Sequence, residues 1–461
     1  MVPKFIIKVF EETGFLSVYN SPYDTKLLCI QRFVRLFAYG GSTLILASHL
    51  NVLEISDGRI GLFMTLTLAG DVLISLFLTL FADGLGRRAI LALGALLMCG
   101  SGVILIISGN YWVLLAAAIF GVISPSGNEI GPFRAIEEST LAQLTPAAAR
   151  SDIYAWYTLI GTAGGAFGMM TCGWVIRCLQ SLRDMGAVES YRMIFFAYAA
   201  LGFVKFLLAI ALSKRVEAEK KKPDPVSETA PLLGERSPEE PLTKNPKKSI
   251  MPSISKESRV IVLNLCILFV LDSFASGLAP LSWVTYFFRR KFNLEEGKLG
   301  SLFFITSIIA AASTLVASSI SKRIGNVKVN HCYSSGLIAS PLLTFFLLQT
   351  MVFTHLPSAI CLALIPNPSS LPFAMLFLIL RACTSSMDVA PRSAFLAAIV
   401  LPNERTAVMA TINVVKTFSQ SIGPSITGVL SEHNLFWVAF VMAGCLKATY
   451  DLGMLAVFAS H

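Results

Sequence analysis

Charged side chains are scarce in this sequence: they make up 14% of its 461 residues, whereas 54% of the residues are hydrophobic. A chain with so few charges cannot cover the surface of a water-soluble globule, and its apolar residues are gathered into runs long enough to cross a bilayer. Lys and Arg together number 37, against 28 Asp and Glu, a surplus that suits cytoplasmic loops beside anionic lipid. Composition therefore predicts an all-α membrane protein.

Several kinds of functional site are also missing from the sequence. The nine cysteines are scattered, at no spacing typical of a zinc site or of a disulfide framework. No Gly-rich phosphate loop and no grouping of a nucleophile with a base is visible, and no basic helix or aromatic platform suits nucleic acid. We therefore expect no enzyme, no metal, no cofactor and no nucleic-acid partner.

The apolar runs predict twelve transmembrane helices in two sets of six. The expected spans lie near 33–53, 60–80, 89–108, 111–131, 153–175, 192–213, 260–288, 299–320, 350–366, 370–388, 407–430 and 435–458. Between the two sets lies 214–259, which is rich in Lys, Glu, Pro and Ser and cannot bury enough apolar surface to fold. Its basic residues predict a cytoplasmic position.

This division predicts four parts of the chain and the side of the membrane on which each loop lies. Residues 1–32 form a cytoplasmic tail, 33–213 the first six-helix bundle, 214–259 a disordered cytoplasmic loop and 260–458 the second bundle. Because six spans precede the cytoplasmic loop and six follow it, both termini are expected in the cytoplasm.

The turn between the second and third spans, residues 81–88, carries the most specific motif in the chain. It resembles the signature loop of the major facilitator superfamily, which reads roughly Gly-x-x-x-Asp-Arg-x-Gly-Arg-Arg. Four positions match this pattern: Asp83, Gly86, Arg87 and Arg88. Thr79 and Gly84 depart from it, since they stand where the family usually has a glycine and a basic residue.

The resemblance has consequences for both fold and mechanism. It implies two pseudo-symmetric six-helix bundles, with a cleft between them at the bilayer midplane that opens alternately to each side. It also implies that the 81–88 turn is a conformational loop, and that the partners of the chain are a small-molecule substrate, protons and the lipid bilayer, with the protein acting as a monomer.

One segment, 329–349, does not fit the twelve-span pattern. It is an extra apolar run that would make a thirteenth span and invert everything after it. Without it, 324–328 would run directly into 350–357 as an uninterrupted sequence. We state two alternatives: a translated fungal intron, or a genuine insertion that lies along the membrane surface. A spliced transcript that still encodes these residues would exclude the first.

Charged residues inside spans are candidates for function because they are costly in lipid. Asp71 lies in the second span and Asp272 in the seventh. Either carboxylate could bind a proton or a cationic substrate. The alternative is that a neighbouring hydroxyl or Arg holds each in place and that it only joins helices. We prefer Asp272 as the proton-coupling residue, because it is a lone carboxylate near Ser273 and Ser276.

A second group of candidates follows the fourth span, where two prolines and two glycines within 125–132 predict a broken helix. Glu129 is the acid nearest the membrane and could contact substrate or protons. Three residues beyond it are interpreted as a gate of salt bridges at the cytoplasmic mouth: Arg134, Glu137 and Glu138.

The tenth span ends with a third group. Asp388 and Arg392 are four residues apart and can pair on one helix face; Arg392 is also a gate candidate. Arg381 lies deeper in the span and is the best candidate for contact with an anion or a counter-ion. Lys447 and Asp451 in the twelfth span are expected to form a structural pair.

The central loop contains a sorting motif candidate in 228–233. An acid, Glu228, precedes the pair Leu232 and Leu233, an arrangement that resembles an adaptor-binding signal for a vacuole or lysosome. The expected location is the plasma membrane or, alternatively, the vacuolar membrane.

The function that this sequence predicts is secondary active transport of a small organic molecule by alternating access. Proton-coupled export of a metabolite or drug-like compound is favoured by the resemblance. Two alternatives remain: a proton-coupled uptake symporter, and a membrane sensor or scaffold that transports nothing.

Overall fold

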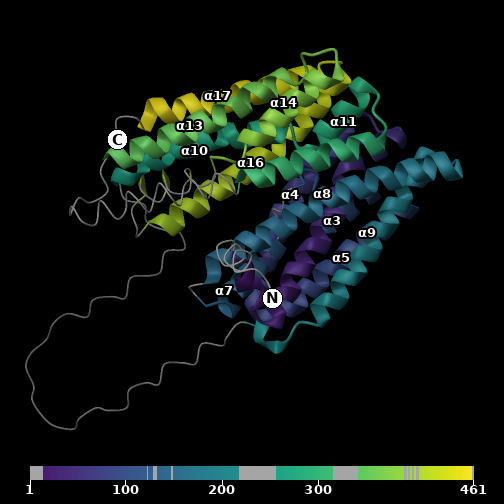
Figure 1. Ribbon diagram of the computed structural model, residues 1–461, viewed down its shortest axis with the longest axis horizontal. Coiled ribbons are helices and arrows are strands. Elements are labelled where there is room, and N and C mark those ends of the chain that lie inside the picture. The colour runs from purple at the N-terminus through teal and green to yellow at the C-terminus, as the bar shows by residue number, and fades with distance from the viewer. Residues whose placement is uncertain are drawn as a thin grey trace, which may run out of the picture.

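The computed structural model describes residues 14–121, 123–127, 132–146, 149–217, 256–314, 341–388, 392, 395–396, 399–400 and 404–458. All regular elements within these ranges are helices (Figure 1). Seven of them are long and apolar enough to cross a membrane, and three shorter apolar helices accompany them. The all-α composition follows from the apolar runs, since only helices satisfy every backbone hydrogen bond within one segment in lipid.

The first half of the chain contains eight α-helices and one short 3₁₀ helix among its described residues. These elements are α2 (Phe15–Tyr19), α3 (Tyr23–Val52), α4 (Asp57–Leu85), α5 (Arg87–Ile107), α6 (Tyr111–Phe120), α7 (Pro132–Leu144), α8 (Arg150–Arg183), α9 (Ala187–Ile210) and η2 (Lys214–Val216). Helix α3 packs against α8, and α5 against α9.

The second half is built in the same way. Its elements are α10 (Lys256–Leu278), α11 (Leu281–Phe292), a helix over Glu296–Thr314, α13 (Pro341–Leu364), α14 (Leu371–Thr384), α16 (Arg405–Glu432) and α17 (Phe436–Phe458). Helix α10 packs against α16, and α13 against α17. Figure 1 shows this group above the first-half helices, and the two groups meet through α4 against α16 and α3 against α11.

Several expected spans differ from the helices that form; α3, for example, begins at Tyr23, within the expected tail 1–32. The run 260–288 is divided between α10 and α11 because Pro280 has no N–H to donate and begins the new helix instead. The run 111–131 stops being helical after Phe120; Pro125 and Gly127, which has φ +70°, follow in the non-helical segment 123–127. The prolines and glycines of this region predicted such a break.

A further difference concerns the segment 329–349. Helix α13 begins at Pro341, so it includes the last nine residues of the segment as well as the expected span 350–366. Leu348 is buried in the apolar core of the second half. Residues 329–340 lie outside the described part of the chain, and the two alternatives for the segment remain predictions.

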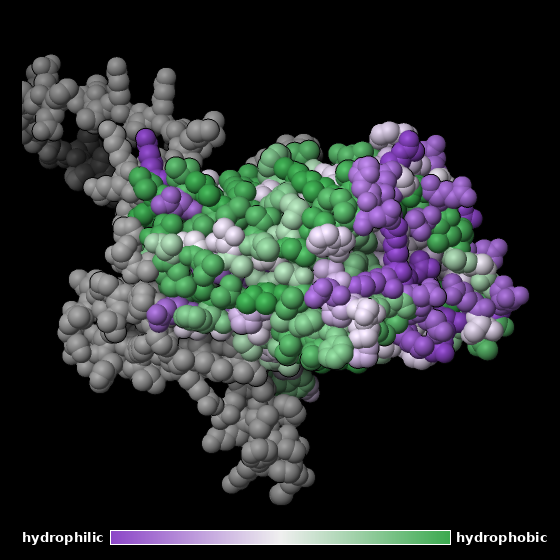
Figure 2. Space-filling model, turned by 90° about the horizontal axis from the view of Figure 1, so that it is seen from above, coloured by the Kyte–Doolittle hydropathy of each residue, from purple (hydrophilic) through white to green (hydrophobic). Residues whose placement is uncertain are grey.

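The molecular surface matches a membrane setting. Figure 2 shows hydrophobic residues over the middle of one face and hydrophilic residues gathered toward its right-hand end. Large apolar side chains such as Leu73, Phe353 and Phe418 are exposed, which is unfavourable in water and favourable against lipid.

The molecule has two ends, the loop end and the Asp57 end. The loop end contains the turn between α4 and α5, residues 85–87, together with α7 and η2. The Asp57 end contains the turn between α3 and α4, residues 53–56, together with the end of α16.

Candidate functional site

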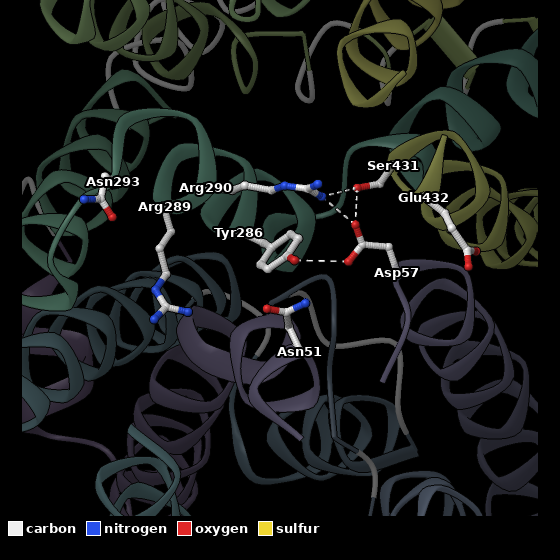
Figure 3. Close-up of a pocket in the computed structure, with 8 residues that line it drawn as sticks. All are labelled: Asn51, Asp57, Tyr286, Arg289, Arg290, Asn293, Ser431 and Glu432. Atoms are coloured by element: carbon white, nitrogen blue, oxygen red, sulfur yellow. Dashed lines mark hydrogen bonds and ion pairs between the residues drawn. The ribbon is translucent and has the colours of Figure 1, made fainter. Parts of the chain in front are cut away.

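A polar joint at the Asp57 end connects the two halves. Asp57 is the first residue of α4, and its carboxylate accepts hydrogen bonds from Arg290 at 2.6 Å, Ser431 at 2.6 Å and Tyr286 at 3.1 Å. Figure 3 shows these three second-half side chains directed at Asp57, beside a cavity of about 550 Å³. A carboxylate with three donors is well satisfied, so this contact stabilises the closed arrangement of this end.

Other contacts between the halves extend the joint. Ser282 of α11 donates to the Thr43 carbonyl at 3.1 Å, and Tyr191 of α9 donates to Glu296 at 2.7 Å. Close helix approach adds to them: a Cβ on Gly428 of α16 would lie 2.5 Å from the Asp57 carbonyl oxygen. The hydrogen bonds and ion pairs between described residues of the two halves all lie toward the Asp57 end.

The 81–88 turn is held to the first half by a residue outside the motif. Glu217, just after η2, accepts from the backbone N–H of Arg87 at 2.7 Å and of Arg88 at 3.4 Å. Its negative charge therefore caps the N-terminus of α5, where unpaired N–H groups favour an anion. The preceding Gly86 has φ +92°, a conformation that favours glycine.

Side chains of the same turn reach neighbouring elements. Arg87 donates to Gln143 of α7 at 2.8 Å, and Gln143 in turn donates to the Glu217 carbonyl at 3.0 Å. Arg88 donates to the Ile210 carbonyl at the end of α9. Asp83 lies in the last turn of α4, and its side chain is outside the described part of the structure.

The residues interpreted as a gate occupy different environments. Arg134 and Glu138 form an ion pair at 2.7 Å on the surface of α7, with both side chains partly exposed. Glu137, by contrast, is fully buried and receives two hydrogen bonds from Arg35 of α3, at 2.6 and 2.7 Å, and one from Tyr157 of α8. The grouping of all three residues in one mouth network is therefore wrong for Glu137, which joins helices inside the first half. Glu129 lies outside the described residues.

Glu137 stays ionised in this setting. It lies on α7, outside the apolar spans. Burial raises the pKa of its carboxyl. The charges of Arg35 and Lys205 and the hydrogen bonds from Arg35 and Tyr157 lower the pKa by more than burial raises it, so the pKa lies below its ordinary value. Arg35 and Lys205 both stand within expected spans, and that position could have identified them as candidates from the sequence.

Asp272 of α10 is not the lone carboxylate that its sequence context predicted. It accepts from Lys447 of α17 at 2.6 Å and from Arg392 at 3.4 Å. Arg392 also donates to Asp388, which confirms the pairing expected from their spacing. The expected pair of Lys447 with Asp451 is wrong: Lys447 contacts Asp272 and Ser276.

Asp451 instead contacts His355 of α13. The imidazole Nδ1 lies 3.0 Å from both carboxylate oxygens, and both side chains are buried. Sequence reasoning did not single out His355, although its position in the expected span 350–366 would have supported that choice. The other intramembrane acid, Asp71, is buried in α4 with the Ser75 hydroxyl at 3.5 Å.

A cavity of about 320 Å³ lies within the second half, closed on one side by a residue of the first half, Ser126. Its polar lining also includes Ser276, Thr306, Ser307, Arg381, Ser385 and Gln420. The Arg381 Nε is buried without a hydrogen-bond partner, and no acid of the described residues pairs with this guanidinium. The structure thus places Arg381 at the wall of a cavity, and its contact with an anion stays a prediction.

The family model of the Major Facilitator Superfamily matches residues 28–359. The chain belongs to this superfamily. It is therefore a multi-pass transporter of the major facilitator fold and not an enzyme, and this fold has twelve helices in two bundles.

Known proteins extend the comparison over nearly the whole chain. An uncharacterized membrane protein of Saccharomyces cerevisiae is 36% identical over 450 residues, which cover 94% of each chain. The superfamily member also shares its fold with a POT family transporter in complex with 5-aminolevulinic acid (TM-score 0.65, 14% identity, 95% of this chain and 96% of that one).

Two further solved structures are similar to this transporter. One is a bacterial homolog to the human lysosomal transporter Spinster, in an inward-facing and occupied conformation (TM-score 0.63, 15% identity, 95% of each chain). The other is the xylose transporter XylE from E. coli, partially occluded and inward open (TM-score 0.60, 12% identity, 95% of this chain and 98% of that one).

Proposed function

We propose that this major facilitator protein carries a small organic anion across the membrane together with a proton, by alternating access. The observation that carries the proposal is Arg381, a cation that lines the cavity of the second half closed by Ser126 and has no acid beside it among the described residues. A charge inside a membrane protein is costly unless it is paired. A substrate anion would supply the missing counter-charge.

The cavity has the size and chemistry for such a ligand. Its volume of about 320 Å³ is at the small end of ligand pockets, which suits a metabolite rather than a large drug. A guanidinium binds a carboxylate or a phosphate through two parallel hydrogen bonds. The surrounding hydroxyls and the Gln420 amide can satisfy the remaining polar atoms of the ligand.

The arrangement of contacts between the halves supports a state that is open toward the loop end. The joint around Asp57 closes the opposite end. The basic residues of 81–88 and 214–259 favour a cytoplasmic position for the loop end, so the state proposed is inward-facing. Two of the similar solved structures are described as inward-facing or inward open.

Coupling to protons is proposed in the direction of symport. A cation exchanger needs a carboxylate that its substrate can reach, whereas Lys447 and Arg392 already occupy Asp272. A cationic cavity binds an anion, and a site that gains a proton can release it on the other side of the membrane. This combination favours movement of the anion and the proton in the same direction. Symport is therefore favoured over the export that the family resemblance implies.

The membrane and the oligomeric state are part of the same proposal. We place the protein as a monomer in the plasma membrane or the vacuolar membrane, with both termini in the cytoplasm. The sorting motif of Glu228, Leu232 and Leu233 would favour the vacuole; these residues lie outside the described part of the chain.

The test is uptake by purified protein in liposomes with an imposed pH gradient. The probes are radiolabelled carboxylates, phosphate esters, amines and sugars, each applied alone. We expect anion uptake that rises when the outside is more acidic, that is lost in Arg381→Gln and that is partly kept in Arg381→Lys. Arg183→Gln is the matched control, since Arg183 is exposed at the end of α8.

Two results would contradict the proposal. Uptake of amines in preference to every anion would exclude Arg381 as the substrate contact. Ligand-dependent thermal stabilisation of the protein without any uptake would support the sensor alternative instead.

A further inference from the structure

His355 and Asp451 form a buried pair of titratable groups in the second half. The contact joins α13 to α17, with Nδ1 at 3.0 Å from each carboxylate oxygen. His355 is 3% exposed and Asp451 is fully buried. The pair lies beside the aromatic ring of Tyr450, 6.2 Å from the imidazole centroid.

The hydrogen-bond chemistry of this pair leaves one position for an added proton. An ionised carboxylate only accepts hydrogen bonds, so the imidazole Nδ1 must carry a hydrogen. In the neutral ring the other nitrogen, Nε2, is then unprotonated and able to gain a proton. The resulting imidazolium would be stabilised by the carboxylate that it already contacts.

Charged side chains of both signs lie around the pair. The acids of the described network are Asp272, Asp388 and Asp451, and the cations are Arg392, Lys416 and Lys447. One proton on His355 adds one positive charge in excess of those already present. Within a membrane such an excess favours entry of an anion nearby.

Direct contacts connect Lys447 with the cavity, whereas Lys447 and the pair are linked through helix α17 and by electrostatic interaction with Asp451. Lys447 lies four residues before Asp451 on α17, and its ammonium donates to Asp272 at 2.6 Å and to Ser276 at 2.8 Å. Ser276 lines the cavity that contains Arg381. A displacement of the Lys447 ammonium would therefore change its electrostatic interaction with Asp451 and its hydrogen bond to Ser276 at the cavity wall.

We propose that the His355–Asp451 pair is the proton-binding site that couples transport, and that Asp272 is a positioning residue between this pair and the cavity. The proposal rests on the function proposed above. One proton binds at Nε2 of His355 while the site is accessible from the side of higher proton concentration. The anion binds at Arg381 when the network carries the extra charge, and both leave on the other side.

The surroundings of the pair support His355 rather than Asp272 as the proton acceptor. Asp272 is held by two cations, Lys447 and Arg392, so protonation there would leave Lys447 without its counter-charge and Arg392 with Asp388 alone. Among the described residues, Asp451 and Tyr450 of α17 contact His355, and Asp272 of α10 interacts with it electrostatically. Lys447, Arg392 and Lys416 in turn lie around Asp272. Helix α14, which also packs against α13, carries Arg381 beside Cys361.

The first experiment requires no substrate. Full-length protein labelled with ¹⁵N-histidine is placed in nanodiscs, and the imidazole signals are followed by NMR from about pH 5 to about pH 8. The His355 signal is identified by its loss in His355→Gln, and the exposed His433→Gln serves as the control for assignment. We expect the ring-nitrogen signals of His355 to show a hydrogen at Nδ1 and the gain of a proton at Nε2 as the sample is acidified. Asp451→Asn should change this response much more than Asp388→Asn does.

The second experiment separates this inference from the proposed function. In liposomes, His355→Gln and Asp451→Asn should exchange labelled for unlabelled carboxylate but lose the accumulation driven by a pH gradient. Wild-type protein that accumulates no anion would overturn the proposed function. Wild-type accumulation that persists unchanged in His355→Gln, or a His355 signal that does not titrate, would overturn the inference alone.

Discussion

Asp57, at the start of α4, and Arg290, near the end of α11, form an ion pair of 2.6 Å that joins the two halves of this transporter. The Asp57 side chain is almost buried, whereas that of Arg290 is half exposed. Tyr286 and Ser431 add two further hydrogen bonds to the same carboxylate. An interaction that exists in only one of the two access states biases the equilibrium between them by its own free energy.

The first prediction concerns removal of this carboxylate. Asp57→Ala should weaken the closed Asp57 end by about 2 kcal/mol, the contribution of hydrogen bonds to a charged group, and so shift the equilibrium between states roughly 30-fold. Spin labels at Leu53→Cys and His433→Cys, in a protein without other cysteines, would report the change as a longer distance in Asp57→Ala. Asp184→Asn is the control, since Asp184 lies in the exposed turn after α8 and Asn tolerates its φ of 50°. An unchanged distance distribution would mean that the ion pair does not hold the halves together.

The second prediction tests the close approach of α4 and α16. A Cβ on Gly428 would lie 2.5 Å from the Asp57 carbonyl oxygen and 2.9 Å from the Gly61 Cα, so Gly428→Ala should disfavour closure by about 1–3 kcal/mol. The same spin-label pair should show a larger open population, and transport should slow. Gly100→Ala is the matched control, because a Cβ at Gly100 would have open space around it. If Gly428→Ala and Gly100→Ala show the same open population, the close contact of α4 with α16 does not control closure of the Asp57 end.

The third prediction concerns the cap on α5. Glu217→Ala removes the acceptor of the Arg87 and Arg88 amides, at a cost of about 1 kcal/mol. Hydrogen exchange of the first turn of α5, measured by mass spectrometry, should become about five-fold faster, since local opening reflects that free energy. Glu189→Ala is a control at the opposite end of the molecule, where α9 begins without a side-chain cap. An unchanged exchange rate in the first turn of α5 would mean that Glu217 does not stabilise the start of this helix.

The fourth prediction concerns the buried pair of Arg35 and Glu137. Glu137→Gln leaves a buried guanidinium without its counter-charge and should destabilise the protein by about 3–5 kcal/mol. Replacement of both residues by Met should recover part of that loss, because no buried charge of the pair remains. Thermal unfolding of the two variants in detergent would measure the difference.

The stabilising effect of this pair should depend on pH in one direction. The pKa of Glu137 lies below its ordinary value in the folded protein, so its stabilisation is present above the unfolded-state pKa and is lost as pH falls through the folded-state value. The difference in Tm between wild type and Glu137→Gln should therefore be constant above about pH 4.5 and shrink below it. A difference that shrinks already near neutrality would mean that Glu137 is not held ionised.

The fifth prediction concerns localisation. Leu232→Ala combined with Leu233→Ala should move a fluorescently tagged protein from an internal membrane to the cell surface if 228–233 is a sorting signal. Leu242→Ala, in the same segment of the sequence, controls for the loss of a leucine. If both variants and the wild type have the same distribution in the cell, 228–233 is not a sorting signal.

Much of the fold followed from hydropathy and from one short motif. Apolar runs report directly on which segments can enter lipid, and the 81–88 turn identified the superfamily, which the match over residues 28–359 confirmed. The pair of Asp388 and Arg392 could also be predicted from the sequence, because residues four apart share a helix face regardless of the rest of the molecule. Helix ends were less accessible: Pro280 starts α11, although the apolar run continues through it.

The partners of buried charges depended on tertiary packing. Lys447 and Asp451 are four apart on α17, yet Lys447 contacts Asp272 of α10 and Asp451 contacts His355 of α13. Hydropathy states that a segment is buried, but it contains no information about which helix lies opposite each face. A charge in the low-dielectric interior is stabilised by the nearest group of opposite charge, and only the packing of α10, α13 and α17 decides which group that is.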